Sequence, residues 1–293
     1  MSRLLFLGLL LLVACQKETP IDEQPVEAKE EVLLYIASRG EGFDIYRNTS
    51  IGLKEEQLTT APGWEWAPQV VLAEGRIIYN SQDTSGNFSQ RAMNLQGEEL
   101  EFRGIDLSGF TIAPSGDRIA YTVERDGGTQ LMIASYPAVA DSAQITRRPN
   151  YHGRPCWSPD GTKLAYISDQ SGSNEIYVYD LTDKRHERLT NNQLREKYLS
   201  WSPDGQQLAT SMQQDTLAAD LFIIGLTDQS VTQITETPID ESEIAWSPLG
   251  GFMAYHAEVE GADDIYVLDL QTGGVKRVTK ADGYHGEPCW ALE

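Results

Sequence analysis

Short runs of apolar, β-branched and aromatic residues alternate with polar turns along most of the chain. The pattern is clearest in Leu164–Ile167 and Ile176–Tyr179, which favour strands and are separated by a polar loop. Pro159-Asp160-Gly161 predicts a hairpin turn before them, because proline presets φ and glycine accepts a positive φ. With one strand ahead of this turn and another at Glu187–Thr190, the segment predicts four short antiparallel strands.

This four-strand unit recurs with a period of about 45 residues, which indicates a repeat architecture. Copies aligned on the tryptophan of Trp-Ser-Pro, or on its counterparts, are spaced by 46, 45, 44, 45 and 44 residues. We call the aligned residues the reference positions: Trp66, Ile112, Trp157, Trp201, Trp246 and Trp290.

The sixth copy ends after its first strand, at Pro288–Glu293. Its missing second, third and fourth strands match segments at the other end of the chain: Val32–Ser38, Asp44–Arg47 and Glu56–Thr59. A ring closed by strands from both ends leaves no unpaired sheet edge. The pattern predicts an all-β, six-bladed β-propeller with four antiparallel strands per blade. Its closing blade would combine one C-terminal strand with three N-terminal strands.

The N-terminal segment has a different composition from the repeats. Ser2-Arg3 is basic, and Leu4–Val13 is apolar but too short to span a bilayer. Leu12-Val13-Ala14-Cys15 resembles the lipobox of bacterial lipoproteins, which implies cleavage before Cys15 and diacylation of its thiol. An ordinary secretory signal that happens to end in cysteine is the alternative. We therefore expect a signal peptide over residues 1–14.

Residues 15–31 are expected to form the lipidated cysteine and a flexible acidic tether, and residues 32–293 the propeller. Gln16 stands where an aspartate would resemble an inner-membrane retention signal, which favours the outer membrane. Gln16-Lys17-Glu18 also resembles the surface-export signals of some lipoproteins. The predicted location is the bacterial cell envelope, facing either the periplasm or the cell surface.

Charge narrows the range of partners. The 44 acidic and 23 basic residues give a formal net charge of −21. This charge argues against nucleic acid, whose phosphates need a basic footprint, and against an electrostatic hold on anionic lipid. We expect a monomeric domain that meets the membrane through its lipid anchor only.

The period, the four strands per copy and Trp157-Ser158-Pro159-Asp160-Gly161 resemble the WD-repeat-like units of TolB-type propellers, over residues 32–293. That resemblance implies binding of a protein or peptide at the central funnel, without catalysis or a cofactor. TolB also has an α/β domain before its propeller and is soluble in the periplasm, whereas this chain shows a tether and a lipobox. We find no recognisable catalytic motif, phosphate loop or dinucleotide fingerprint in the sequence.

The tryptophans and cysteines are interpreted as architecture. One aromatic residue per copy fills the wedge between neighbouring blades. Cys156 and Cys289 precede two of the tryptophans and lie three copies apart, on opposite sides of the predicted ring. We therefore expect two free, buried thiols rather than a disulfide, which needs Cα atoms within about 7 Å.

The histidines are the strongest candidates for chemistry. Tyr151–Trp157 and Tyr284–Trp290 share the pattern Tyr-His-Gly-x-Pro-Cys-Trp, and each histidine is predicted to enter a first strand at the funnel rim. The residues five places before the reference positions are Ala61, Leu107, His152, Glu196, Glu241 and His285. The last four suggest structural capping of the strand, contact with a polar ligand, or a metal site, since a divalent metal accepts this ligand set.

The leading hypothesis is a non-enzymatic, lipid-anchored binding propeller of the envelope. Its predicted contact residues are Tyr151, His152, Arg154, Arg195, Glu196, Tyr198, Glu241, Tyr284, His285 and Glu287. One alternative is a metal-assisted lyase or hydrolase acting on an acidic oligosaccharide, because pectin-fragment lyases resemble this repeat family and use a histidine-rich metal site. Another is a surface-exposed scaffold lipoprotein.

Overall fold

The computed structural model describes residues 29–38, 40, 42–49, 54–102, 109–192, 194–214, 218–280 and 282–293. The predicted signal peptide, Cys15 and most of the tether lie outside these residues. Every regular element in the described part is a β-strand, so the prediction of an all-β fold is confirmed. No helix long and apolar enough to cross a membrane occurs there.

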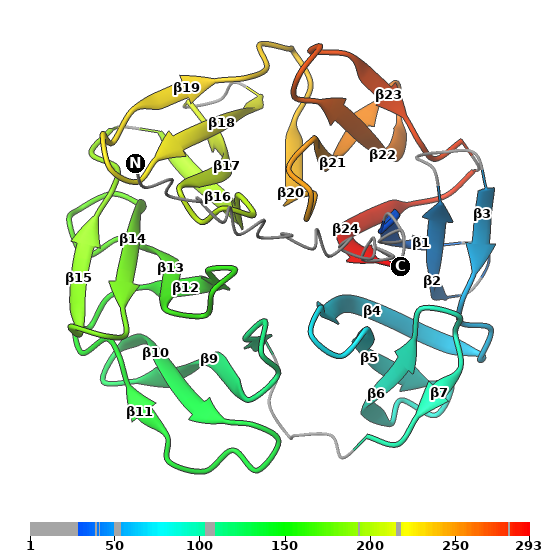
Figure 1. Ribbon diagram of the computed structural model, residues 1–293, viewed down its shortest axis with the longest axis horizontal. Coiled ribbons are helices and arrows are strands. Elements are labelled where there is room, and N and C mark those ends of the chain that lie inside the picture. The colour runs from blue at the N-terminus through cyan, green and yellow to red at the C-terminus, as the bar shows by residue number, and fades with distance from the viewer. Residues whose placement is uncertain are drawn as a thin grey trace, which may run out of the picture.

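Four sheets have four antiparallel strands each, in the order in which the chain forms them. Their strands are β8 (Thr111–Ile112), β9 (Arg118–Arg125), β10 (Gly128–Ser135), β11 (Ala143–Gln144); β12 (His152–Trp157), β13 (Lys163–Ser168), β14 (Glu175–Asp180), β15 (Arg185–Arg188); β16 (Arg195–Trp201), β17 (Gln207–Gln213), β18 (Ala219–Gly225), β19 (Val231–Gln233); β20 (Glu241–Trp246), β21 (Phe252–Val259), β22 (Ala262–Asp269), β23 (Val275–Arg277). The sheets stand side by side around a ring (Figure 1).

The remaining strands form one open sheet of eight, so the hydrogen-bonded sheets among the described residues number five. They are β24 (His285–Leu292), β1 (Glu31–Ser38), β2 (Phe43–Thr49), β3 (Lys54–Gln57), β4 (Gly63–Val71), β5 (Arg76–Asp83), β6 (Phe88–Asn94) and β7 (Glu99–Leu100). A single parallel pair, Phe43 with Trp64, joins β2 to β4. It merges two units of four strands, β24 with β1, β2 and β3, and β4 with β5, β6 and β7. We call each of these units, and each of the four separate sheets, a group. In the first group the C-terminal β24 pairs with the N-terminal β1, with Trp290 opposite Leu33.

The first strand of each group lies toward the middle of the ring (Figure 1). We call β4, β8, β12, β16, β20 and β24 the inner strands. Each inner strand contacts the inner strands of its neighbours, and β24 contacts both β20 and β4. The centre of the molecule is therefore lined by segments far apart in the sequence.

Apolar burial is concentrated between neighbouring groups. Six clusters of buried residues each combine side chains of two adjacent groups, for example Leu131 of β10 with Trp157 and Leu164 of the next group. Burial of apolar surface on both faces of a sheet is what allows a ring of small sheets to be stable.

Three of the reference tryptophans also reach across to the preceding inner strand by a hydrogen bond. The indole N–H of Trp157 donates to the Thr111 carbonyl, that of Trp201 to Cys156 and that of Trp290 to Ala245. The prediction that these rings fill the wedge between neighbours is confirmed.

The alignment of the first copy is wrong. Val70, not Trp66, takes the reference position, because Val70 pairs with Ile77 as Trp157 pairs with Leu164. The equivalent of His152 is consequently Glu65, which pairs with Ser81, and not Ala61. The bulky Trp66 dominated the alignment, although the span from reference position to second strand is seven residues in the other copies and eleven from Trp66.

Cys156 and Cys289 are free, as predicted. Both residues keep some exposed surface, but burial of their thiols raises the pKa of each to about 12, as expected for buried sulfur. Each precedes a buried tryptophan in an inner strand, where side chains on alternate residues point to opposite faces.

Candidate binding site at the centre of the ring

The inner strands are interrupted by β-bulges at equivalent places. In β4, β12, β16, β20 and β24 the pairing with the neighbouring strand shifts by one residue. The residues three places before the reference positions stand at these bulges or, for Gly109, just before β8. We call them the bulge ring: Ala67, Gly109, Arg154, Tyr198, Glu243 and Glu287.

Five members of the bulge ring have a left-handed backbone. The φ angles of Ala67, Arg154, Glu243 and Glu287 are 51–52°, and that of Gly109 is 69°. This conformation is uncommon for residues other than glycine, and such residues cluster at functional sites. A bulge changes the direction of the following side chain, and here it turns these residues toward the centre.

A central pocket of about 390 Å³ lies among them. Its lining residues come from four inner strands and the bulge of β4: Ala67, Pro68, Gln69, Arg154, Tyr198, Leu199, Glu243, Ile244, Glu287 and Pro288. The pocket thus contains three of the residues predicted from sequence, Arg154, Tyr198 and Glu287.

Two glutamates form one side of the central pocket. The backbone N–H of Glu287 donates to the Glu243 carboxylate at 2.7 Å, and the N–H of Ala67 donates to the Glu287 carboxylate. The Tyr284 phenol donates to Glu243 at 3.3 Å. Burial raises the pKa of Glu287, and the negative charge of Glu243 raises it further. This pair of carboxylates, short of cationic partners, favours a positively charged group.

Arg154 and Tyr198 supply a different chemistry in the same pocket. The Arg154 guanidinium lies 4.3 Å from the centre of the Tyr198 ring, a cation–π contact between neighbouring inner strands. Burial raises the pKa of Tyr198, so its phenol stays neutral at physiological pH. The pocket therefore offers carboxylates, a neutral phenol and a guanidinium within one small space.

An aromatic pocket of about 370 Å³ shares Glu287 with the central pocket. It is lined by Ile36, Phe43, Trp64, Trp66, Gln82, Tyr284 and Glu287. The Phe43 ring lies 4.9 Å from Trp64 and 5.6 Å from Tyr284, both edge-on. Trp64 is 44% exposed. Exposed aromatic rings of this kind are enriched where proteins bind other proteins.

The four polar residues predicted at the funnel rim are buried instead. His152, Glu196, Glu241 and His285 are 0–2% exposed, and so is Glu65, their equivalent in the first copy. We call these five the buried ring. Among the described residues, no three His, Cys, Asp or Glu side chains gather closely enough to hold a metal ion. The predicted alternative of a metal site made by His152, Glu196, Glu241 and His285 is therefore wrong in geometry.

Members of the buried ring contact the group that precedes their own. His285 Nδ1 lies 2.9 Å from the Asp263 carbonyl of β22, to which it donates, and Glu241 accepts hydrogen bonds from Thr235 and Thr237. Glu196 accepts from the Asn192 side chain at 3.0 Å. Burial raises the pKa of Glu196 to about 7. These contacts connect adjacent groups, as expected for a structural role.

The repeated Tyr-His-Gly triplet has a packing explanation. The phenol oxygen of Tyr151 lies 2.2 Å from where a Cβ on Gly153 would be, and that of Tyr284 is equally close above Gly286. Only glycine lets the tyrosine fold over its own strand in this way. Tyr151 remains 39% exposed. Arg195 is exposed at the start of β16, away from the lining of both pockets.

Sequence reasoning missed Glu243, Trp64 and Phe43. Glu243 occupies the same repeat position as Arg154 and Glu287, so comparing residues three places before each reference position finds it. Trp64 and Phe43 come together only through the parallel pairing of β2 with β4, for which the sequence contains no signal.

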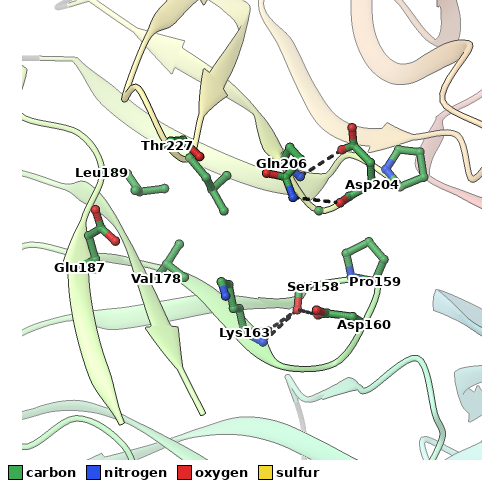
Figure 2. A pocket seen from close by; sticks show the side chains of 13 residues that line it. Ser158, Pro159, Asp160, Lys163, Val178, Glu187, Leu189, Asp204, Gln206 and Thr227 are labelled. Carbon is green, nitrogen blue, oxygen red and sulfur yellow. Dashed lines mark hydrogen bonds between the residues drawn. The ribbon is translucent and has the colours of Figure 1, made fainter. Parts of the chain in front are cut away.

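A second kind of hollow lies between neighbouring groups, and Figure 2 shows one of about 500 Å³ between the β12–β15 and β16–β19 sheets. Its acidic side chains already serve their own turns. Asp160 accepts from Ser158 and from the Thr162 backbone, and Asp204 accepts from Ser202 and the Gln206 backbone. Asp160 and Asp204 therefore stabilise turns, and we do not interpret this hollow as a binding site.

Comparison with known proteins now fixes the family. A family model described as TolB beta propeller domain matches residues 140–293, more than half of the chain. The chain belongs to the TolB beta propeller domain family. The predicted resemblance to TolB-type propellers is confirmed at this level.

Individual relatives match shorter segments. A TolB homolog from Protochlamydia amoebophila is 40% identical over 53 residues, which cover 18% of this chain and 11% of that protein. A TolB homolog from Chlorobium luteolum is 24% identical over 152 residues, 51% of this chain and 34% of that protein. The TolB-like chain thus matches 11% and 34% of the length of these two relatives.

The fold agrees with solved TolB structures. The crystal structure of TolB from Acinetobacter baumannii superposes with a TM-score of 0.71 at 17% identity, over 88% of this chain and 66% of that one. At this identity the likeness shows a shared propeller fold, and the chemistry of the centre has to be argued from the residues themselves.

Proposed function

We propose that this TolB-like chain is a non-enzymatic binding propeller of the bacterial cell envelope, which engages a protein or peptide partner at the central pocket. In this proposal it has six blades, the last made of β24 with β1, β2 and β3, and Cys15 carries the lipid anchor. The family supports the proposal, as do curated relatives named as Tol-Pal system proteins.

The bulge ring is the observation that carries the proposal. Its members share one backbone position, yet they differ in side chain: alanine, glycine, arginine, tyrosine and two glutamates. The repeat therefore does not dictate their chemistry. The left-handed backbone holds these side chains at the centre at a cost in strain, which a purely structural position does not need.

The charges of the site define the partner's chemistry. Glu243 and Glu287 favour a lysine, arginine or terminal amine, because a cation relieves the repulsion between two neighbouring carboxylates. The aromatic pocket beside them fits an apolar side chain. We infer a partner segment that presents a basic residue next to an apolar or aromatic one.

A photo-crosslinking amino acid placed at Tyr198 in living cells tests this function. We expect a discrete adduct with an envelope protein, and we expect a Glu243→Gln/Glu287→Gln background to reduce its yield by about tenfold, the usual effect of losing a buried charge contact. Adducts are identified by mass spectrometry.

The matched control is the same crosslinker at Val275, which is 52% exposed on the outer strand β23. Adducts of equal yield from both positions, or an adduct at Tyr198 that the double variant leaves unchanged, would contradict central binding. The scaffold alternative expects the first of these results. The lyase or hydrolase alternative has no support from the residues described, because its proposed ligands are buried and separate.

A further inference from the structure

A groove of about 980 Å³ lies on the outside of the ring, between β11 and the outer strands β14 and β15 (neighbours in Figure 1). Its lining contains four cationic side chains, Arg147, Arg148, Lys184 and Arg188, and no aspartate or glutamate. The whole chain has nearly two acidic residues for each basic one. A cationic groove without a single carboxylate is thus a local reversal of the protein's charge.

The alternating direction of the side chains along β15 determines the positive charge of the groove. Lys184, His186 and Arg188 line the outer groove, whereas Glu187 lines the neighbouring hollow of Figure 2. Successive side chains of a strand point to opposite faces, so Lys184, His186 and Arg188 lie on one side, whereas Arg185 and Glu187 lie on the other. Arg147 and Arg148 follow β11 and close the groove near the Arg188 end.

Three of the four cationic side chains that line the groove are accessible to a ligand. Arg147, Arg148 and Lys184 are exposed, and none of the ion pairs within the described residues involves them. Arg188, by contrast, is paired with Glu175 at 2.9 Å. The free cations stand at the two ends of β15, because Lys184 precedes that strand and the two arginines lie beyond its other end.

Aromatic rings form the floor between these ends. Tyr166, Tyr177 and Tyr179 line the groove with His186. The Tyr166 and Tyr177 rings are stacked 5.5 Å apart, and the Tyr166 hydroxyl lies 2.9 Å from His186 Nδ1. Tyr166, Tyr177 and Tyr179 are only 0%, 6% and 8% exposed, so the floor is closely packed beneath the exposed His186.

We propose that this outer groove binds an extended acidic peptide segment of a partner protein, at a site separate from the central pocket. An extended chain advances about 3.3 Å per residue, so a segment of about five or six residues follows β15 and places acidic side chains against both cationic ends. The guanidinium groups pair with carboxylates by two parallel hydrogen bonds, and the exposed His186 contacts the residues between. Screening confines the repulsion by the rest of the protein to about 8 Å at physiological salt.

The test is calorimetric titration of the protein with unlabelled hexaglutamate and with hexalysine, at about 0.15 M salt. We expect saturable binding of hexaglutamate that is weakened by about tenfold or more in Arg147→Glu/Arg148→Glu. Binding of hexalysine, which the acidic centre favours, should not be weakened by the same variant. The control Arg185→Glu makes the same substitution once, on an exposed residue of the same strand that does not line the groove, and should alter the affinity for hexaglutamate by about twofold at most.

Three outcomes overturn the proposal: no binding of hexaglutamate, equal weakening by Arg185→Glu, or binding of anionic phosphatidylglycerol vesicles that depends on Arg147 and Arg148 while hexaglutamate does not bind. The double variant's circular dichroism and unfolding curve should match those of the unaltered protein, since both arginines are exposed. Glu243→Gln should leave hexaglutamate binding unchanged, which separates this site from the centre.

Discussion

The buried ring and the bulge ring lie two residues apart in each copy, but they behave as different parts of the molecule. His285 is fully buried and contacts the preceding group, whereas Glu287 lines the central pocket. In a regular strand, residues two apart point to the same face. The bulge between them breaks that alternation and turns the second side chain inward. One extra residue thus separates the buried contacts from the lining of the central pocket.

The comparison indicates which positions of the repeat can change in residue type with the smaller loss of stability. Buried-ring residues are glutamate or histidine. His285 and Glu196 have partners that belong to the adjoining group, so a substitution of either residue disturbs two groups, whereas Glu65 accepts from Ser81 of its own group. Bulge-ring side chains line the central pocket, and the contacts that they make between neighbouring inner strands involve backbone N–H groups or the single cation–π pair of Arg154 and Tyr198. Stability should therefore be sensitive to the first ring and binding to the second.

The largest expected effect is a loss of stability when a residue of the buried ring is replaced. His285→Ala removes the hydrogen bond to the Asp263 carbonyl and leaves a cavity beside Tyr35, whose ring lies 6.3 Å from the imidazole. We expect the free energy of unfolding to fall by about 2–4 kcal/mol. Urea unfolding followed by tryptophan fluorescence measures it.

The control for that substitution is Arg195→Ala, an exposed residue of another inner strand, which should change stability by about 0.5 kcal/mol or less. If His285→Ala were as mild as this control, the buried ring would not connect the groups as described.

A second effect comes from the titration of Glu196. Its folded-state pKa of about 7 exceeds the ordinary value of 4.5, so the folded protein keeps a proton that the unfolded chain has released. The contribution of Glu196 to stability is therefore full below pH 4.5 and is lost as the pH rises to about 7. The loss amounts to about 3 kcal/mol. Glu196→Gln should thus stabilise the protein by up to that amount at pH 8 and change little at pH 4.5.

His152 works in the opposite direction, because burial lowers its pKa and its contribution to stability is lost as the pH falls below 6.5. The useful measurement is therefore the difference between Glu196→Gln and the unaltered protein in urea unfolding at several pH values. A difference that stays constant from pH 4.5 to 8 would show that folding does not raise the pKa of Glu196.

The smallest effect is expected in the bulge ring. Arg154→Ala removes the cation–π contact with Tyr198, which contributes about 0.5–1 kcal/mol at a partly exposed site. A double-mutant cycle with Tyr198→Leu, measured by urea unfolding, should give a coupling energy of this size. A coupling above about 2 kcal/mol would mean that this pair belongs to the architecture after all.

Much of the fold could be predicted because most copies of the repeat carry several signals at once. Tryptophans, Pro-Asp-Gly turns and apolar runs recur together, so the strands around Trp157, Trp201 and Trp246 were placed correctly. The alignment of the first copy is wrong because it rests on the tryptophan alone. Trp66 has the right residue type, but its distance from the second strand is wrong.

The site was predicted in part for a related reason. Arg154, Tyr198, Tyr284 and Glu287 line the pockets, as expected for residues at the start of inner strands. Sequence could not separate them from His152 and Glu241, because a bulge leaves no compositional signal. The energetic difference between the two rings arises from backbone geometry that only the assembled strands define.

The pairing of β24 with β1 has a consequence for the timing of folding. Glu30 and Glu293 exchange both backbone hydrogen bonds, so strands that are far apart in the order of synthesis are partners in one sheet. Until β24 leaves the ribosome, β1 keeps one unpaired edge that other chains could occupy. The nascent protein must therefore hold an open arc of sheets until β24 has been synthesised, and only then can β1 gain its second partner.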